Sequence, residues 1–391
     1  MARPTIIKSP SQRFKKFLDV IKLFAKTCGA NIFAEDYRIN ALTCLITILV
    51  NCFMLFNFYT IYVSVAKDNY HIVLQNLCVV GTAIQGFSKL INAIVYQDLT
   101  RFTCSEIEFM YRTFETEEQH YVDVLNTSLK LLKRIIFTIL KIYGILTIAI
   151  LISPMIIQMI TNERLFILNV FIPGVDVDTT VGFIIIQTFN AACTTFSGFG
   201  NFAADTACFM LGAHTPLMKD IIKCKLIDLD EVLRKHPKDR SRTEPLVKDI
   251  IQWHQRYIIF TEKNTSNFFW MIFIQVASSV MGIISNMVCM FLGGWPVAPL
   301  YLLSSFVILF CYCSLGNLVE LSNEDMCDNI YECKWYELTV PEQKMILIML
   351  RESQKPNNLS VGGVASLSMN TGLQLTKSIY SVAMLLNNSL N

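Results

Sequence analysis

Ala41–Ala66 reads ALTCLITILVNCFMLFNFYTIYVSVA, a run without a charged side chain. A helix that crosses a bilayer needs about 20 mostly apolar residues, because each residue rises about 1.5 Å through a hydrocarbon core about 30 Å thick. This run therefore predicts a transmembrane helix. The whole chain of 391 residues is 53% hydrophobic and only 16% charged, whereas soluble domains contain about 25% charged residues. Its mean hydropathy of +0.45 excludes a disordered chain, a disulfide-rich miniprotein and most soluble enzymes.

Six further segments have the same apolar character. They are residues 71–96, 135–160, 179–213, 267–292, 297–321 and 361–386. Segment 179–213 is the least apolar and is rich in Gly, Ser, Thr and Asn, so we expect it to face other helices or a cavity more than lipid. The sequence predicts an all-α polytopic membrane protein with seven transmembrane helices.

Lys and Arg are distributed unevenly between the loops. Residues 1–40, 97–134, 214–257 and 322–360 hold eight, five, ten and four of them, whereas the alternating loops hold only Lys67 and Arg164. Because cytoplasmic loops retain Lys and Arg, the N-terminus is predicted to be cytoplasmic and the C-terminus, after seven spans, extracellular. G-protein-coupled receptors have the opposite orientation. The chain also lacks their Asp-Arg-Tyr and Asn-Pro-x-x-Tyr motifs, which excludes that class.

Two cytoplasmic regions outside the spans have helical patterns. In the N-terminal segment 1–40, apolar residues recur at helical spacing between lysines, which predicts an amphipathic helix. These apolar residues are Phe14, Phe17, Leu18, Ile21, Phe24 and Ala25. The helix either lies at the inner membrane surface or packs on the cytoplasmic loops.

The second region is 335–360. Thr339-Val-Pro-Glu342 has the Thr-x-x-Glu spacing of a helix capping box. An apolar stripe of Met345, Ile346, Met349 and Leu350 follows it. The predicted helix is too short and polar to span a membrane. Its apolar stripe therefore needs a partner, either another cytoplasmic segment or a neighbouring subunit.

Motifs of enzyme chemistry are missing from the sequence. It contains no Gly-rich phosphate loop, His-Glu-x-x-His or Gly-x-Ser-x-Gly, so we expect no enzyme activity and no cofactor. The few histidines and scattered cysteines predict no metal site, and a net charge of +2 gives no reason to expect a nucleic-acid partner. Asp205 and Lys377 lie inside apolar segments, where ionisable groups are costly. Each either pairs with neighbours or lines an ion route.

The C-terminal 80 residues or so carry a recognisable order of residues. It comprises Gly316-Asn317, Trp335-Tyr-Glu-Leu, Gln343-Lys344, Leu350, Gln354-Lys-Pro356, Gly362-Gly363, Leu367-Ser368, Thr371 and Lys377-Ser-Ile-Tyr380-Ser381. This order and spacing resembles the C-terminal pattern of insect odorant receptors, specifically their odour-tuning subunits. The chain departs from many relatives at Gly372, where they have Phe, and a glycine there loosens a helix.

The resemblance implies a ligand-gated, non-selective channel for monovalent and divalent cations, assembled as a heterotetramer with co-receptor subunits. It also implies a place in the plasma membrane, in the dendrites of olfactory sensory neurons. Four regions follow from it: a cytoplasmic segment 1–40, six membrane helices with cytoplasmic extensions in 41–334, an anchor helix in 335–360, and a pore-lining seventh helix with a short tail in 361–391. Subunits would meet at an anchor formed by Trp335, Tyr336, Met345, Ile346, Met349 and Leu350. The pore face would be Tyr380, Ala383, Asn387 and Asn391, four residues at helical spacing.

The resemblance further implies an odorant pocket in the outer half of the helix bundle. We expect it to be lined by Gln75, Cys78, Val79, Thr147, Leu151, Met155, Phe183, Gln187, Ala191, Tyr301 and Ser305. A mainly apolar wall with a few hydrogen-bonding groups suits a compact, neutral volatile, and the aromatic side chains are compatible with an aromatic one. The alternatives are a secondary transporter, which would show internal repeats that we do not find, and a non-conducting membrane scaffold.

Overall fold

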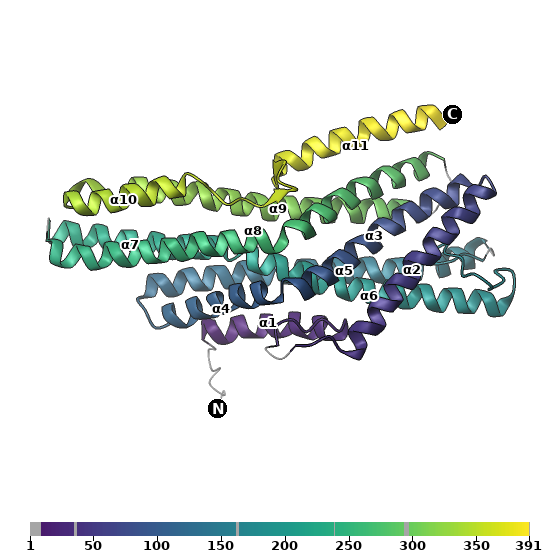
Figure 1. Ribbon diagram of the computed structural model, residues 1–391, viewed down its shortest axis with the longest axis horizontal. Coiled ribbons are helices and arrows are strands. Elements are labelled where there is room, and N and C mark those ends of the chain that lie inside the picture. The colour runs from purple at the N-terminus through teal and green to yellow at the C-terminus, as the bar shows by residue number, and fades with distance from the viewer. Residues whose placement is uncertain (1–8, 35–36, 162–163, 238, 293–296, 391) are drawn as a thin grey trace.

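The computed structural model describes residues 9–34, 37–161, 164–237, 239–292 and 297–390. It is an elongated bundle whose helices run mostly along one axis (Figure 1). The elements are α1 (Pro10–Thr27), α2 (Ala41–Ala66), α3 (Tyr70–Val95), α4 (Gln97–Phe114), α5 (Gln119–Thr161), α6 (Thr180–Gly212), α7 (Thr215–Lys235), α8 (Arg240–Phe291), α9 (Ala298–Glu332), a 3-10 turn (Trp335–Glu337), α10 (Val340–Ser353), β1 (Ser360–Val361), β2 (Ala365–Ser366) and α11 (Met369–Leu390).

Five of the described helices are long and apolar enough to cross a membrane, namely α2, α3, α5, α8 and α9. They contain five of the seven predicted segments. The other two segments fall in α6 and α11, which are more polar because α6 is rich in Gly, Ser, Thr and Asn and α11 carries Lys377 and several amides.

Three of the apolar segments are parts of much longer helices. α8 has 52 residues, or about 78 Å at about 1.5 Å per residue, although only its second half is apolar. α5 and α9 continue in the same way past their apolar parts. These extensions, together with α7 and α10, form one end of the molecule, and the turn between α2 and α3 lies at the other (Figure 1). We call them the basic end and the opposite end, since the basic loops lie at the first.

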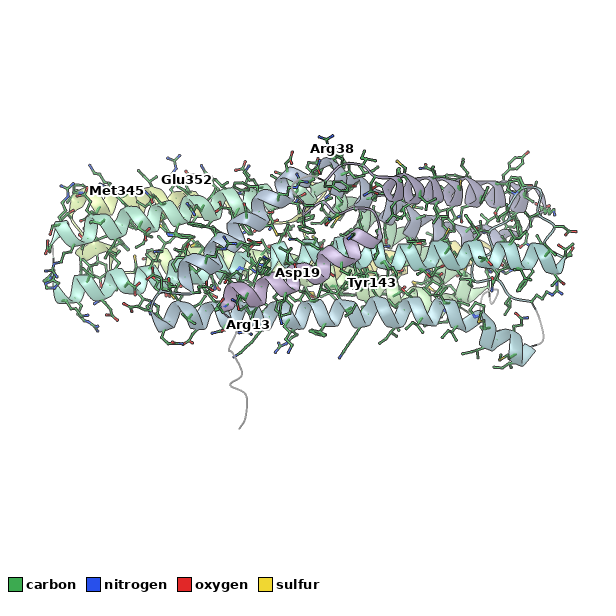
Figure 2. All side chains as sticks on the ribbon, turned by 90° about the horizontal axis from the view of Figure 1, so that it is seen from below. Arg13, Asp19, Arg38, Tyr143, Met345 and Glu352 are labelled. Atoms are coloured by element: carbon green, nitrogen blue, oxygen red, sulfur yellow. The ribbon has the colours of Figure 1, made fainter. Side chains whose placement is uncertain are left out.

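The N-terminal helix α1 packs against α4, α5 and α6. Phe14, Leu18, Ile21 and Ala25 are buried in the core of the chain. Of the two alternatives for this amphipathic helix, the structure therefore has the one in which its apolar stripe packs on the rest of the protein. Figure 2 shows α1, which carries Arg13 and Asp19, lying along the side of the bundle, with Met345 and Glu352 far away at the basic end.

The seventh predicted segment begins differently from the expectation. We predicted a helix from residue 361, but residues 360–366 form a two-stranded hairpin in which Val361 pairs with Ala365, and α11 begins only at Met369. Gly362 and Gly363 both have positive φ, at 61° and 74°, and the Val364 N–H donates to the Val361 carbonyl at 3.2 Å. Such a turn needs positive φ at both central residues, which Gly adopts readily and a helix does not use.

The start of α11 is held against α9. A Cβ atom at Gly372 would lie 2.9 Å from the Cys313 Sγ, so the glycine lets the two helices approach closely. A larger side chain there would press on the side chains of Cys313 and Phe310 of α9. Gly372 is thus a contact point between α9 and α11 as well as a residue of low helix propensity.

Buried apolar residues form two clusters. The larger one fills the basic end and the middle of the bundle, and the smaller one fills the opposite end around Phe53, Val79, Leu168 and Tyr301. A cavity lies between them, with walls drawn from both.

Candidate functional site

The cavity has a volume of about 230 Å³. Side chains from α2, α3, α5, α6 and α9 line it, together with the end of α1 and the segment after it. Towards the opposite end its wall is apolar and includes Phe53, Val79, Ile150, Leu168 and Tyr301. An engineered apolar cavity of about 150 Å³ holds benzene, so this cavity has room for a somewhat larger small molecule.

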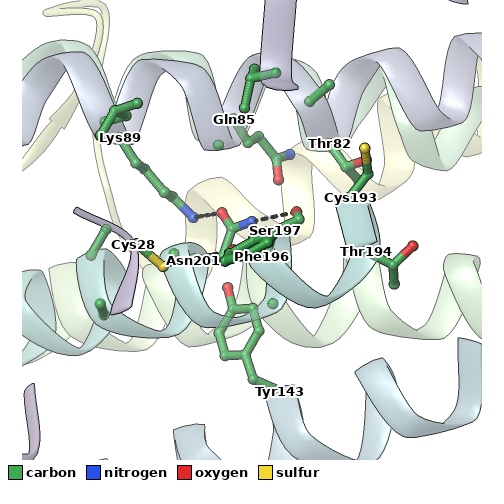
Figure 3. Close-up of a pocket in the computed structure, with 18 of the residues that line it drawn as sticks. Cys28, Thr82, Gln85, Lys89, Tyr143, Cys193, Thr194, Phe196, Ser197 and Asn201 are labelled. Atoms are coloured by element: carbon green, nitrogen blue, oxygen red, sulfur yellow. Dashed lines mark hydrogen bonds between the residues drawn. The ribbon is translucent and has the colours of Figure 1, made fainter. Parts of the chain in front are cut away.

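Towards the basic end the wall becomes polar. Lys89 of α3 forms an ion pair with Asp205 of α6, with 2.6 Å between Nζ and Oδ1, and the two side chains are only 2% and 3% exposed. Lys89 also donates a hydrogen bond to Asn201 Oδ1 at 2.9 Å. Figure 3 shows Gln85 and Lys89 of α3, Asn201 of α6 and Tyr143 of α5 converging on the same space.

Two tyrosines complete the coordination of the carboxylate. The Tyr312 hydroxyl of α9 donates to Asp205 Oδ1 at 2.6 Å, and the Tyr143 hydroxyl of α5 donates to Oδ2. The network therefore joins α3, α5, α6 and α9. Removing one partner of a buried ion pair leaves an uncompensated charge, which is costly. Rotations of the four helices that keep Lys89, Tyr143 and Tyr312 in contact with Asp205 are therefore favoured.

Of the two alternatives for Asp205, pairing with neighbours or lining an ion route, the structure shows pairing. Lys377, for which we left the same two alternatives, is exposed on α11. Sequence reasoning did not place Lys89, Asn201, Tyr143 or Gln85 at the site. The available signal was a lysine and an aspartate, each inside its own apolar segment, since two such opposite charges are less costly when they meet.

A segment between α5 and α6 covers the cavity at the opposite end. Residues 167–171, the roof segment, turn inward so that Ile167, Leu168 and Val170 are buried. Side chains of neighbouring helices bond its backbone: Asn190 donates to the Leu168 carbonyl at 2.8 Å, and the Phe171 N–H donates to Thr60 Oγ1 at 2.7 Å. A buried backbone needs such partners, so these amides and hydroxyls are what allow a loop to lie inside the bundle.

Two predicted ligand residues belong to this roof. Gln187 Oε1 accepts from the Ile167 N–H at 3.1 Å, and Gln75 Oε1 accepts from the Asn169 side chain at 2.5 Å. Both residues therefore hold the roof segment, and neither is among the residues that line the cavity.

The other predicted ligand residues fall into three groups. Val79, Thr147 and Tyr301 line the cavity. Cys78, Leu151 and Ala191 pack in the smaller apolar cluster beside it. The remaining three make other contacts: Met155 is exposed, the Phe183 ring lies tilted against Phe166, and Ser305 donates to the Tyr301 carbonyl of its own helix.

The predicted pore residues do not share one exposed face of α11. Tyr380 is 57% exposed and Asn387 is half-buried, whereas Ala383 is fully buried against the bundle. Asn391 lies outside the described residues. A polar stripe at helical spacing, formed by Gln374, Lys377 and Ser381, is exposed instead.

A helix is present in the predicted region 335–360, preceded by the 3-10 turn at Trp335–Glu337. Its capping box forms: Glu342 accepts a bond of 2.9 Å from the Thr339 N–H and one of 2.6 Å from the Thr243 hydroxyl of α8. The apolar stripe packs against its own chain, with Ile346 and Met349 buried and Trp335, Met345 and Leu350 partly buried. The exposed large apolar residues of α10 and of the turn before it are Tyr336, Val340, Leu347 and Ile348.

Comparison with known proteins gives consistent results along most of the chain. The family model described as 7tm Odorant receptor matches residues 69–380. The chain is similar to the putative odorant receptor 83c of Drosophila melanogaster, with 23% identity over 97% of this chain and 98% of that protein. It is also similar to odorant receptor 22c of the same species, with 24% identity over 45% of this chain and 46% of that protein.

Solved structures show the same fold. The insect olfactory receptor OR5 from Machilis hrabei, in complex with eugenol, superimposes with a TM-score of 0.78 over 98% of this chain and all of that chain, at 14% identity. The structure of the same receptor described without eugenol gives a TM-score of 0.77, over 97% of this chain and 99% of that chain, also at 14% identity. This is a seven-helix, all-α membrane fold, so α6 and α11 join the five more apolar helices. The chain is therefore a member of the insect odorant receptor family, a multi-pass membrane receptor and not an enzyme.

Proposed function

We propose that this chain is the odour-tuning subunit of an odorant-gated, non-selective cation channel. It assembles with co-receptor subunits into a heterotetramer in the plasma membrane of olfactory sensory neurons. The observation that carries the proposal is the cavity of about 230 Å³ between two apolar clusters, bounded by five helices and covered by the roof segment. Its mainly apolar wall suits a small volatile, and eugenol, the compound bound in the similar olfactory receptor, is a small aromatic molecule.

α9 provides a physical route from this cavity to the helix that we assign to the pore. Its first half lines the cavity through Tyr301 and Ile308. Further along, Cys313 lies against the start of α11, and Gly316 lies against Leu367 just before it. A ligand that binds more tightly after α9 has shifted would favour the position of α11 that accompanies this shift. The change in the open fraction of the channel is limited by the ratio of the ligand's affinities for the two conformations.

The exposed polar stripe of α11 supports a pore on that side of the helix. Gln374, Lys377 and Ser381 would be costly against lipid, so we place them towards water in the assembled channel. Tyr380 and Asn387 flank the stripe. Ala383, which we also predicted for the pore, is buried in this conformation and would reach the pore only if α11 rotated.

Cysteine accessibility tests this assignment. A Ser381→Cys variant co-expressed with the co-receptor should lose odorant-evoked current on exposure to a charged thiol reagent. An Ala383→Cys variant is the matched control, two residues along the same helix, and should be modified more slowly. Equal modification of the two positions would contradict the assignment.

The exposed apolar residues at the basic end support assembly with other subunits. Tyr336, Val340, Leu347 and Ile348 lie on α10 or just before it and are exposed apolar residues. Exposed apolar groups of this kind are typical of protein interfaces. Trp335 and the apolar stripe Met345, Ile346, Met349 and Leu350 pack beneath these residues and would hold them in place for this contact.

The decisive experiment is whole-cell current at fixed voltage, with the chain expressed alone and with the co-receptor, during application of a panel of small volatiles. Evoked cation current that requires both chains supports the proposal. If both chains reach the cell surface, no volatile evokes current and labelled volatiles do not bind, the transporter or scaffold alternative is favoured.

A further inference from the structure

The polar end of the cavity has hydrogen-bonding capacity that the protein itself does not use. A lysine ammonium has three donors. Among the described residues, Lys89 has two partners for these donors, Asp205 and Asn201, and its side chain lines the cavity. Gln85 stands beside it, 8% exposed. Its Nε2 lies 3.3 Å from Ser279 Oγ, and its amide oxygen points into the cavity in Figure 3.

The charge at this end is balanced. Lys89 is paired with Asp205, and both carboxylate oxygens of Asp205 accept tyrosine hydroxyls, which leaves the carboxylate little capacity for a further donor. A ligand carboxylate would bring an uncompensated negative charge into a poorly solvated site, and an amine would bring a second cation next to Lys89. A neutral group that accepts a hydrogen bond meets neither penalty.

The rest of the wall requires an apolar body. Phe53, Val79, Ile150 and Leu168 line the cavity away from Lys89. Scaling from the six non-hydrogen atoms of benzene in about 150 Å³, the volume of about 230 Å³ corresponds to roughly 9 non-hydrogen atoms. The ligand would lie with its apolar part towards the roof segment and its polar atom towards Lys89.

We infer that the cavity selects neutral molecules of this size that carry one hydrogen-bond-accepting oxygen at an end of an apolar body, bound by the Lys89 ammonium. The inference rests on the proposed function, because it names the ligand class of the same cavity. Lys89 acts here as a ligand-binding residue as well as a member of the buried ion pair.

Binding to the purified receptor complex tests the inference without relying on channel opening. The probes are two ketones and the hydrocarbons in which a methylene group replaces the carbonyl oxygen: 2-nonanone with 2-methyl-1-nonene, and 4-phenyl-2-butanone with its methylene analogue. Nonanoate and nonylamine supply the charged cases. Dissociation constants come from the rise in unfolding temperature with probe concentration. We expect each ketone to bind roughly ten to a hundred times more tightly than its hydrocarbon partner, as a bond to a charged donor would give.

The Lys89→Met/Asp205→Asn double variant removes both charges and keeps an acceptor for the tyrosines. It should therefore fold, whereas Lys89→Met alone leaves a buried carboxylate without a counter-charge. In this variant the ratio between ketone and hydrocarbon should fall to about one. Thr194→Val, which removes a hydroxyl elsewhere in the wall, should leave the ratio unchanged, and Ile150→Ala should weaken both members of a pair equally.

Several outcomes overturn the inference: a ratio near one in the unmodified receptor, a ratio that survives the double variant, tighter binding of nonanoate than of 2-nonanone, or binding by no probe. Current recorded from the same panel separates it from the proposed function. Equal currents from ketone and hydrocarbon would leave the receptor function standing and remove the ligand class. Lys89-dependent binding without any current would support the ligand class and contradict the proposed channel function.

Discussion

Gly316 of α9 lies directly against the backbone of Leu367, in the segment that joins the hairpin to α11. A Cβ atom at Gly316 would overlap the Leu367 carbonyl, and Leu367 itself is buried. Backbone cannot move aside as a flexible side chain can, so this position accepts only glycine unless the two elements separate. The contact ties the start of the proposed pore helix to a helix that lines the cavity.

Gly316→Ala should therefore destabilise the protein by about 1–3 kcal/mol, the usual cost of overpacking, and change the odorant concentration needed for half-maximal current. Thermal unfolding and dose–response curves measure the two effects. Gly282→Ala is the matched control, because Gly282 is also in a membrane helix but a Cβ atom there would meet nothing within 4 Å. Equal unfolding temperatures for the two variants would contradict the prediction.

The Lys89–Asp205 pair should be strongly coupled in stability. Lys89→Met alone leaves Asp205 buried and unpaired, which should cost about 3–5 kcal/mol. The double variant Lys89→Met/Asp205→Asn should recover most of this loss, since the remaining groups are neutral. A double-mutant cycle of unfolding free energies gives the coupling. Additive effects would mean that the pair does not contribute as a unit.

The roof segment should loosen when its side-chain partners are removed. Asn190→Ala leaves the buried Leu168 carbonyl without its 2.8 Å donor, at a cost of about 1–3 kcal/mol. Hydrogen exchange of residues 167–171 should accelerate, and a bound ligand should dissociate faster. Thr188→Ala is the control on the same helix, because Thr188 is exposed and bonds only to its own helix. An unchanged hydrogen-exchange rate of residues 167–171 in Asn190→Ala would contradict the prediction that Asn190 stabilises the roof segment.

The basic end should lose stability in acid through His254. Burial lowers the pKa of His254 to about 4, and its Nε2 lies 2.7 Å from Ser353 Oγ of α10. The unfolded chain takes up a proton near pH 6.5 and the folded chain does not, so stability is complete above pH 6.5 and falls as the pH drops towards 4, by about 3 kcal/mol in total. Unfolding at pH 7 and pH 5 measures the effect.

His254→Gln should flatten this dependence, whereas His236→Gln should not, because His236 is exposed at the end of α7. His214 provides a second, independent contribution of the same sign, since burial lowers its pKa to about 4 as well. An unchanged acid limb in the His254→Gln variant would contradict the assignment to His254.

Lys377→Gln should raise the single-channel cation conductance if the exposed stripe of α11 faces the pore. A positive side chain beside the ion path repels cations, and removing it lowers that barrier. Recordings from channels formed with the co-receptor should show an increase of roughly two-fold at low salt, shrinking as salt screens the charge. Lys344 is an exposed residue of α10, and Lys344→Gln should leave the conductance unchanged. Equal conductance for the two variants would place Lys377 away from the pore.

The apolar segments, the predicted cytoplasmic end and the Thr339–Glu342 capping box could all be read from contiguous residues. The free energy of placing a segment in lipid, or of capping a helix, depends on that segment's own composition and spacing. These properties are therefore present in the sequence before any tertiary contact forms. Lys89 and Asp205 both lie inside apolar segments of the sequence, but composition and spacing do not place them against one another.

Only the tertiary structure decided which side chains meet. How each helix rotates and where it crosses its neighbours turned Gln75 and Gln187 towards the roof segment and the Met345–Leu350 stripe towards its own chain. The same packing brought Lys89 to Asp205, more than a hundred residues away along the chain. We also began the seventh segment at residue 361 on the basis of its hydropathy. Hydropathy carries no information on backbone angles, and the positive φ of Gly362 and Gly363 ends the match to a helix there. Pairings between distant residues depend on the free energy of the whole packed bundle, and no single segment carries that information.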